Sequence, residues 1–369
     1  MSRDGALLRL SRMSALDRPA KPGFDLPSQM PGTSADPASD YPAPDETPTP
    51  PHPIWGPHGG HMALDPEIAG FLEQMQAAGF PAFGSIAAPD LRRFLKGLAE
   101  MAPAGPAMAT VRDVMAEAGG QPVPIRLYVP RTAPRALILF FHGGGWTIGS
   151  VAESDGFARL LASSLGCAVA SVDYRLAPEH PFPAAVDDAF AALRWIADHG
   201  AELLGQPCPL LLFGDSAGAN LAAVATLLAR DAGGPAIAGQ VLLNPSTTPD
   251  ADSRPAGDID SPFITRDEIA WLFDQYVPDP ATRRDPRFAP LGAASHAALP
   301  PALILTAEHD LLRTDGEAYA ETLASAGVRV VAKRYPGAIH SWLTLNPAFA
   351  LSQQALADIG RFVDELLDG

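Results

Sequence analysis

Ser216 lies at the centre of the run Gly214-Asp215-Ser216-Ala217-Gly218. The apolar residues 209–213 predict a short buried strand before it, and residues 220–230 predict a helix after it. Ser216 would then sit on a tight strand-to-helix corner, where glycines two residues away on either side leave room for the backbone to turn. The positive end of the helix would favour negative charge beside the hydroxyl. This spacing predicts a nucleophilic serine.

A glycine-rich run, His142-Gly143-Gly144-Gly145-Trp146, follows a predicted buried strand over residues 136–141. Glycines at the end of a strand let backbone N–H groups come close to a ligand. In ester hydrolysis, that ligand is the oxyanion of a tetrahedral intermediate. The expected donors are the N–H groups of Gly144, Gly145 and Ala217.

The same glycines have two alternative interpretations. Gly143, Gly145 and Gly149, with Asp173 after the next strand, loosely resemble a dinucleotide-binding fingerprint. The third glycine falls at the wrong interval, bulky Trp146 occupies the loop, and an oxidoreductase would leave Ser216 unexplained. No Lys-Ser or Lys-Thr pair follows the glycines, as a phosphate-binding loop of the Walker type requires. We therefore expect no cofactor.

A serine nucleophile needs a histidine base and an acid that orients it, in the chain order Ser, Asp, His for this type of fold. Asp310 follows a predicted strand over residues 302–307, and His340 lies in a loop after another over residues 328–334. We favour this pair. Among the other candidates, Glu308 and Asp315 are alternative acids and His309 is a neighbouring bystander. His142 is expected to organise its loop, whereas His180, His199 and His296 are interpreted as surface or packing residues.

Five motifs in this order give the chain a family resemblance: HGGGW at 142–146, DYRLAPEHPFPAA at 173–185, GDSAG at 214–218, EHDLLRTDGEAY at 308–319 and GAIHSW at 337–342. From about residue 62 to its end, the chain resembles the hormone-sensitive-lipase family of bacterial carboxylesterases. The resemblance implies an α/β-hydrolase fold with a helical cap. It also implies Ser216 as nucleophile, Asp310 and His340 as its partners, and the HGGG run as oxyanion hole.

The chain departs from the family pattern at three places. Ser341 and Trp342 stand where the family usually has Gly-Phe after the histidine, Ala219 replaces a commoner glycine, and Leu311 follows Asp310 where proline is usual. None of these changes removes a reacting group, but detailed substrate preference cannot be borrowed from relatives. The residues predicted to bind the substrate are Trp146, Tyr174, Trp271, Phe273 and Trp342.

The composition agrees with an enzyme that acts on small molecules. The 369 residues are 47% hydrophobic, enough for one large core, and the net charge of −16 argues against nucleic acid or an anionic membrane surface as partner. Cys167 and Cys208 border apolar runs and are predicted to be buried free thiols, which fits a reducing, cytoplasmic location. No cysteine set or histidine pair has the spacing of a zinc site, so no metal is expected.

The first 61 residues differ from the rest. They are rich in proline, glycine, serine and threonine without apolar periodicity, which predicts a flexible tail. The start of the chain resembles neither a signal peptide nor a membrane span, Met62 is an alternative start, and the histidines of residues 58–61 are expected to be inert. Residues 62–110 predict cap helices, over 66–78 and 89–101. Residues 111–369 form the predicted catalytic domain, with a further cap segment at about 255–285.

The alternation of elements predicts an α/β fold with a mainly parallel sheet and helices on both faces. The further predicted strands cover residues 124–129, 167–173 and 238–243, and the further helices cover 184–204, 221–230, 318–326 and 351–367. Right-handed crossovers would bring the ends of the strands, and hence the motif loops, to one crevice.

The prediction is a serine carboxylesterase that hydrolyses short- to medium-chain esters of small molecules, with a homodimer as one expected state. An amidase, lactonase or deacetylase would use the same residues. A non-catalytic small-molecule receptor on the same scaffold is a further alternative, against which His340 argues because such a receptor needs no base.

Overall fold

The computed structural model describes residues 63–101, 105–117, 120–249, 259 and 261–368, all within the compact unit Pro53–Gly369. The predicted tail over residues 1–61, Met62, and part of the second predicted cap segment lie outside the described residues.

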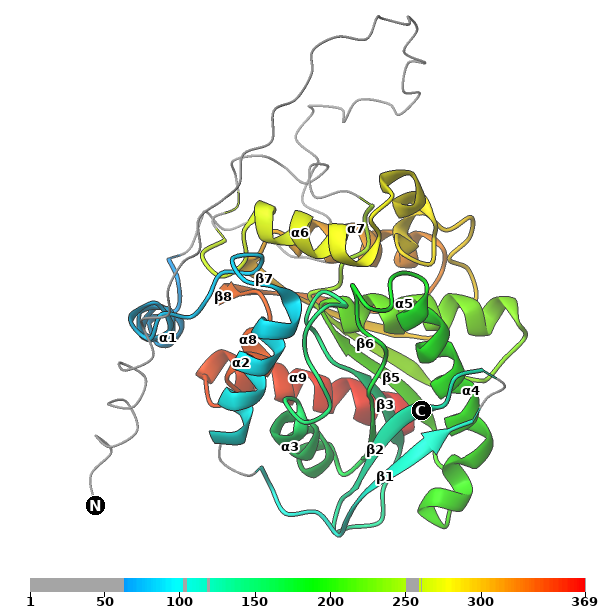
Figure 1. Ribbon diagram of the computed structural model, residues 1–369. Helices are drawn as coiled ribbons and strands as arrows, with labels where there is room; N and C mark the ends of the chain where they lie inside the picture. Colours follow the sequence, from blue (N-terminus) through cyan, green and yellow to red (C-terminus); the bar gives the residue numbers. More distant parts are fainter. Residues whose placement is uncertain (1–62, 102–104, 118–119, 250–258, 260, 369) are drawn as a thin grey trace, which may run out of the picture. The chain divides into compact units, whose positions relative to one another are not determined.

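Within these ranges one eight-stranded sheet forms, in the order β1-β2-β4-β3-β5-β6-β7-β8 (Figure 1). Each of the seven predicted strands is present, and from β4 and β3 through β8 all neighbours are parallel. The strands are β1 (Thr110–Ala116), β2 (Val123–Val129), β3 (Leu137–Phe141), β4 (Ala168–Val172), β5 (Leu210–Asp215), β6 (Gly239–Leu243), β7 (Ala302–His309) and β8 (Val330–Ile339). The predicted α/β-hydrolase fold with a mainly parallel sheet is confirmed.

Strand β1 was not predicted. It lies at the edge of the sheet, pairs antiparallel with β2 alone, and most of its side chains are exposed. An edge strand that buries so little apolar surface leaves a weak sequence pattern. β2 also pairs antiparallel with β4, so this end of the sheet is antiparallel.

Helices cover both faces of the sheet because successive side chains of the central strands point to opposite sides. Leu139 and Phe141 of β3 belong to a core cluster that includes residues of α4, α5 and α7, whereas Ile138 and Phe140 belong to a second cluster with residues of α3 and α9. Figure 1 shows these helices around the sheet. These helices are α3 (Asp155–Leu165), α4 (Ala184–Leu204), α5 (Ala217–Asp231), α7 (Arg313–Ser325) and α9 (Ala350–Leu367), and the short helix α8 (Trp342–Leu345) precedes the last of them.

Helix boundaries differ from prediction where glycine or polar residues begin a helix. α5 begins at Ala217 rather than 221, and α7 begins at Arg313 rather than 318. Their first turns contain Gly218 and Gly316, which are poor helix formers, and tertiary packing overrides that preference. Helix α3 was not predicted at all.

Three helices fall in the predicted cap segments: α1 (Pro66–Ala77), α2 (Ala88–Met101) and α6 (Arg266–Tyr276). The first two match their predicted ranges to within one residue. Arg92 of α2 donates to the Thr147 carbonyl at 2.7 Å and to the Ala177 carbonyl, and forms an ion pair with Glu179. Helix α2 is thereby attached to the loops that follow β3 and β4.

The two cysteines are free thiols, as predicted. Cys167 is buried, but Cys208, just before β5, is only half-buried, so the prediction of burial is correct for one of them. None of the helices in the described part of the chain combines the length and apolar character needed to span a membrane.

Candidate active site

The residues of interest lie at the carboxyl ends of four strands of the parallel part of the sheet. β3 is followed by His142, β5 by Ser216, β7 by Asp310 and β8 by His340. Because parallel strands end at the same edge, residues far apart in sequence meet there. The register that pairs His309 with Ile339 brings Asp310 beside His340.

Ser216 occupies the predicted corner between β5 and α5. Its backbone has φ +55° and ψ −117°, a conformation that costs free energy for a residue with a side chain, and its N–H donates to the Leu243 carbonyl at 2.8 Å. A Cβ on Gly214 would lie 2.1 Å from the Gly218 carbonyl oxygen, and one on Gly218 would lie 2.0 Å from that of Phe141. The two glycines are therefore required for the corner to close.

His340 connects the serine to a carboxylate. Its Nε2 lies 2.9 Å from Ser216 Oγ, and its Nδ1 lies 2.8 Å from Asp310 Oδ2. Asp310 is completely buried, and its other oxygen accepts a hydrogen bond from the Leu312 N–H at 2.9 Å. A carboxylate at Nδ1 keeps the proton on that nitrogen, which leaves Nε2 able to accept the proton of the hydroxyl.

The alternative acids have other partners. Asp315 accepts hydrogen bonds from the N–H groups of Thr247 and Thr248 and from the Thr248 hydroxyl, at 2.9 to 3.1 Å. Glu308 accepts one from the Gly337 N–H at 2.9 Å. The structure thus brings Asp310, rather than these residues, to His340 Nδ1.

The glycine run forms a loop that faces Ser216. Gly144 and Gly145 have φ of +118° and +57°, and a Cβ on Gly144 would lie 2.2 Å from the Ile148 carbonyl oxygen. Ala217 is the first residue of α5. Among the described residues, no acceptor takes a hydrogen bond from the N–H groups of Gly144, Gly145 or Ala217. Three backbone donors close to the serine therefore remain available to a ligand.

His142 organises this loop, as predicted. Its ring stacks on Tyr174 with 4.3 Å between centroids, and its Nδ1 lies 2.7 Å from the Gly143 carbonyl. Burial lowers the pKa of His142, so the ring is neutral near pH 7. Of the other histidines, His180 is exposed, His199 stacks on Trp195 and His296 packs against Tyr319, all consistent with surface or packing roles.

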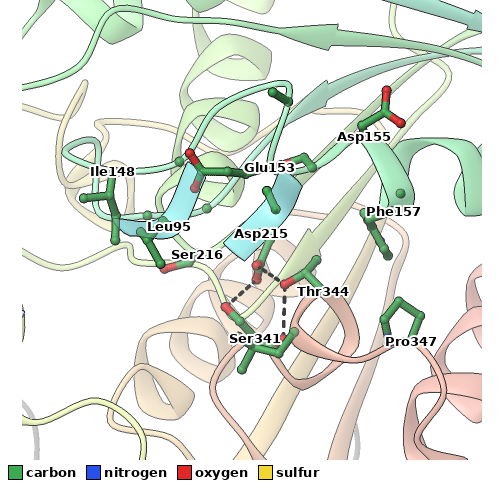
Figure 2. A pocket seen from close by; sticks show the side chains of 18 of the residues that line it. Leu95, Ile148, Glu153, Asp155, Phe157, Asp215, Ser216, Ser341, Thr344 and Pro347 are labelled. Atoms are coloured by element: carbon green, nitrogen blue, oxygen red, sulfur yellow. Dashed lines mark hydrogen bonds between the residues drawn. The ribbon is translucent and has the colours of Figure 1, made fainter. Parts of the chain in front are cut away.

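Ser216 and His340 line a cavity of about 710 Å³. Figure 2 shows Ser216 at this cavity. The glycine loop forms one part of its wall. Much of the rest is apolar and comes from the predicted cap segments, the β3–α3 region and the turn after β8. These apolar residues are Phe80, Phe83, Leu95, Ile148, Phe157, Leu160, Phe263, Leu272, Leu345 and Pro347. Such a lining suits a small apolar or partly apolar substrate.

The five aromatic residues predicted to bind substrate are absent from the lining of this cavity, which corrects that prediction. Trp146 stacks on Tyr276 at 4.7 Å, and Phe273 packs against Phe288 at 5.0 Å. Trp146 belongs to the HGGGW motif and Phe273 to the predicted second cap segment, but both large rings point into the core, where burial stabilises them most.

The other three also pack away from the cavity lining, Tyr174 and Trp342 in the interior and Trp271 half-buried. Tyr174 stacks on His142, Trp342 is fully buried 4.9 Å from Tyr335, and Trp271 packs over Gly84. Two of the wall residues that sequence reasoning missed, Phe80 and Phe83, lie in the loop between α1 and α2. The only signal there was a cluster of apolar residues in a loop.

Asp215 was also given no role from the sequence. Its side chain is buried beside Ser216 and accepts hydrogen bonds from Ser341 and Thr344. Burial raises the pKa of Asp215. In the described part of the chain, no three His, Cys, Asp or Glu side chains are grouped so that they could hold a metal ion.

Comparison with known proteins identifies the class. Residues 138–344 match the family model of the alpha/beta hydrolase fold. The carboxylesterase NlhH of Mycobacterium tuberculosis is 43% identical over 64% of this chain and 75% of its own length. An arylesterase of Saccharolobus solfataricus is 35% identical over 76% of this chain and 93% of its own.

A solved structure agrees. The hyperthermophilic esterase of Pyrobaculum calidifontis superposes with a TM-score of 0.73 at 35% identity, over 83% of this chain and 99% of that one. The chain belongs to the α/β-hydrolase fold family, in its branch of carboxylesterases similar to hormone-sensitive lipase. It is a carboxylic ester hydrolase.

Proposed function

We propose that the protein is a serine esterase that hydrolyses short- to medium-chain acyl esters of small molecules. The observation that carries the proposal is the continuous line of contacts from Asp310 through His340 to Ser216, which opens into the cavity. In this proposal Ser216 is the nucleophile, His340 the base, and Asp310 the residue that orients it.

The first half-reaction forms an acyl-enzyme. His340 Nε2 removes the proton as Ser216 Oγ attacks the ester carbonyl, and the carbonyl oxygen becomes an oxyanion. The N–H groups of Gly144, Gly145 and Ala217 donate to that oxyanion. The intermediate then collapses and breaks the bond between the acyl carbon and the ester oxygen, which takes the proton of the imidazolium, stabilised by Asp310, and leaves as the alcohol.

The second half-reaction reverses these roles. Water enters in place of the alcohol, His340 takes one of its protons, and the hydroxide attacks the acyl carbonyl. Collapse of the second intermediate breaks the bond to Ser216 Oγ, which regains its proton from His340. The acid product leaves, and the enzyme returns to its starting state.

The proposal for chain length rests on the cavity. Its volume of about 710 Å³ lies within the usual range of sites for small ligands, and side chains from both cap segments close one side of it. In our proposal residues 62–110 and the segment at about 255–285 act as the cap. Acyl chains of about two to eight carbons would fit, and the longest chains would extend beyond the wall.

Two measurements test this function. Ser216→Ala should lower kcat by roughly 10⁴- to 10⁶-fold, while Ser295→Ala, an exposed serine elsewhere, should not. A series of p-nitrophenyl esters from acetate to palmitate should give its highest kcat/KM at short to medium chains. Retention of wild-type activity by Ser216→Ala would refute the nucleophile, and a maximum at palmitate would refute the chain length.

A further inference from the structure

Asp215 is a buried carboxylate that the proposed reaction does not use. It is the last residue of β5, immediately before Ser216, and only 3% of its surface is exposed. Its Oδ1 accepts a hydrogen bond from Ser341 Oγ at 3.0 Å, and its Oδ2 accepts one from Thr344 Oγ1 at 2.6 Å (Figure 2). Both oxygens therefore face the segment that follows His340.

That segment is a tight turn. Ser341 has φ +56°, the left-handed region that favours glycine, and the helix α8 begins directly after it. The Ser341 hydroxyl gives this position a contact that glycine could not make. The Thr344 hydroxyl lies 3.1 Å from the Ser341 carbonyl as well, so its single hydrogen is shared between that carbonyl and Asp215.

Asp215 also touches the glycine loop. A Cβ on Gly143 would lie 3.0 Å from Asp215 Oδ2, so the carboxylate packs against the start of that loop. One side chain thus lies between the turn that carries His340, the loop that carries Gly144, and Ser216 itself.

Burying the ionised form of Asp215 costs free energy, and neighbouring groups stabilise that form. Burial raises the pKa of Asp215, whereas His340 and the Thr344 and Ser341 hydroxyls act in the opposite direction. Two hydroxyl donors suit an ionised carboxylate, which offers acceptors at both oxygens. An amide at this position keeps one acceptor oxygen, and its NH₂ group would force the other hydroxyl to accept instead of donate.

We propose that Asp215 is a positioning residue, which fixes the turn after His340 through the Ser341 and Thr344 hydroxyls and so holds His340 Nε2 at Ser216 Oγ. This inference rests on the proposed function, because it assigns Asp215 a role in the alignment of the proposed base. Asp215 does not itself touch the reacting atoms.

The test compares single and double variants with p-nitrophenyl butyrate as substrate. Asp215→Asn should lower kcat on the order of 10²-fold with little change in KM, as displacement of a catalytic group does. Thr344→Val should lower kcat roughly tenfold, the effect of losing one hydrogen bond to a charged group, whereas Thr344→Ser should regain most of it.

A double variant separates positioning from general damage. If Thr344 acts through Asp215, adding Thr344→Val to Asp215→Asn should cost almost nothing further. The matched control is Thr322→Val, which removes the 2.8 Å hydrogen bond from the Thr322 hydroxyl to the Ala318 carbonyl, within α7 and outside the cavity lining, and should leave kcat unchanged. Thermal unfolding of each variant identifies losses of activity that arise because the variant is unfolded at the assay temperature.

Two outcomes would overturn the inference: wild-type kcat in folded Asp215→Asn and Thr344→Val, or the same loss from Thr344→Val in both backgrounds. If Asp215→Asn does not fold, Thr344→Val decides instead, with Thr344→Ser as its rescue. Failure of the proposed function would appear differently, as activity that survives Ser216→Ala.

Discussion

The Glu268 carboxylate accepts a hydrogen bond from the Phe83 backbone N–H at 2.8 Å. Glu268 lies in the first turn of α6, and Phe83 lies in the loop between α1 and α2, so one bond joins two segments 185 residues apart. Phe83 and Leu272 of α6 both line the cavity. The bond therefore fixes two parts of the cavity wall relative to each other.

Removing this bond should weaken substrate binding more than catalysis. Glu268→Ala should raise KM for p-nitrophenyl hexanoate about fivefold, the effect of one hydrogen bond, with kcat nearly unchanged. Steady-state kinetics check this. Thr265→Ala is the control, because it removes the side-chain contacts of Thr265 with Glu268 at the helix start but leaves the Phe83 contact in place. Equal KM effects from both variants would contradict the prediction.

Asp310→Asn should lower kcat by roughly 10²- to 10⁴-fold, because an amide at His340 Nδ1 favours the tautomer that cannot accept the serine proton. Asp315→Asn is a matched control, since Asp315 is equally buried but holds Thr247 and Thr248. It should lower the free energy of unfolding by about 1–3 kcal/mol and leave kcat near wild type. Kinetics and chemical denaturation separate the two, and a reversed pattern would identify Asp315 as the acid.

Gly144 and Gly145 should differ in whether a substitution can be rescued. A Cβ on Gly145 would lie 2.5 Å from a methyl carbon of Leu272, whereas one on Gly144 would meet the Ile148 backbone. Gly144→Ala and Gly145→Ala should each lower kcat by about 10²-fold or more through displaced oxyanion donors. Adding Leu272→Ala should restore part of kcat to Gly145→Ala only. Rescue of both variants, or of neither, would contradict the assigned geometry.

The two thiols should react at different rates. Burial raises the pKa of Cys167 to about 11, and because the thiolate is the reactive form, little of it exists at pH 8. A thiol reagent should therefore label one cysteine in the native protein and two after unfolding. Raising the pH from 8 to 9 should add little labelling, since both values lie well below that pKa. Cys208→Ser should abolish the native labelling, and fast labelling in that variant would refute the prediction.

Sequence reasoning succeeded where local rules decide the structure. The corner at Ser216 follows from two glycines around a strand-to-helix junction, and the helix at 184–204 was predicted with its observed ends. The position of Asp310 and His340 after neighbouring strands followed from the order of the motifs. In each case residues close in sequence, or a rule of chain topology, carried the information.

Sequence reasoning failed for residues whose positions are decided by packing against other parts of the chain. Trp146 and Trp342 are each the last residue of a functional motif, yet their rings pack against Tyr276 and Tyr335 in the core. The cavity wall instead contains Phe83, whose position depends on Glu268. The contacts of Asp215 with Ser341 and Thr344 span more than 120 residues, and no local pattern indicates them.

The helices α1, α2 and α6 lie outside the sheet. Side chains of α2 and α6 line the cavity in front of Ser216. Part of the cavity wall and the proposed reacting groups therefore reside in separable portions of the polypeptide. Directed evolution confined to residues 80–99 and 263–272 could change which esters are hydrolysed, because Ser216, His340 and Asp310 lie on other elements and would be left unchanged.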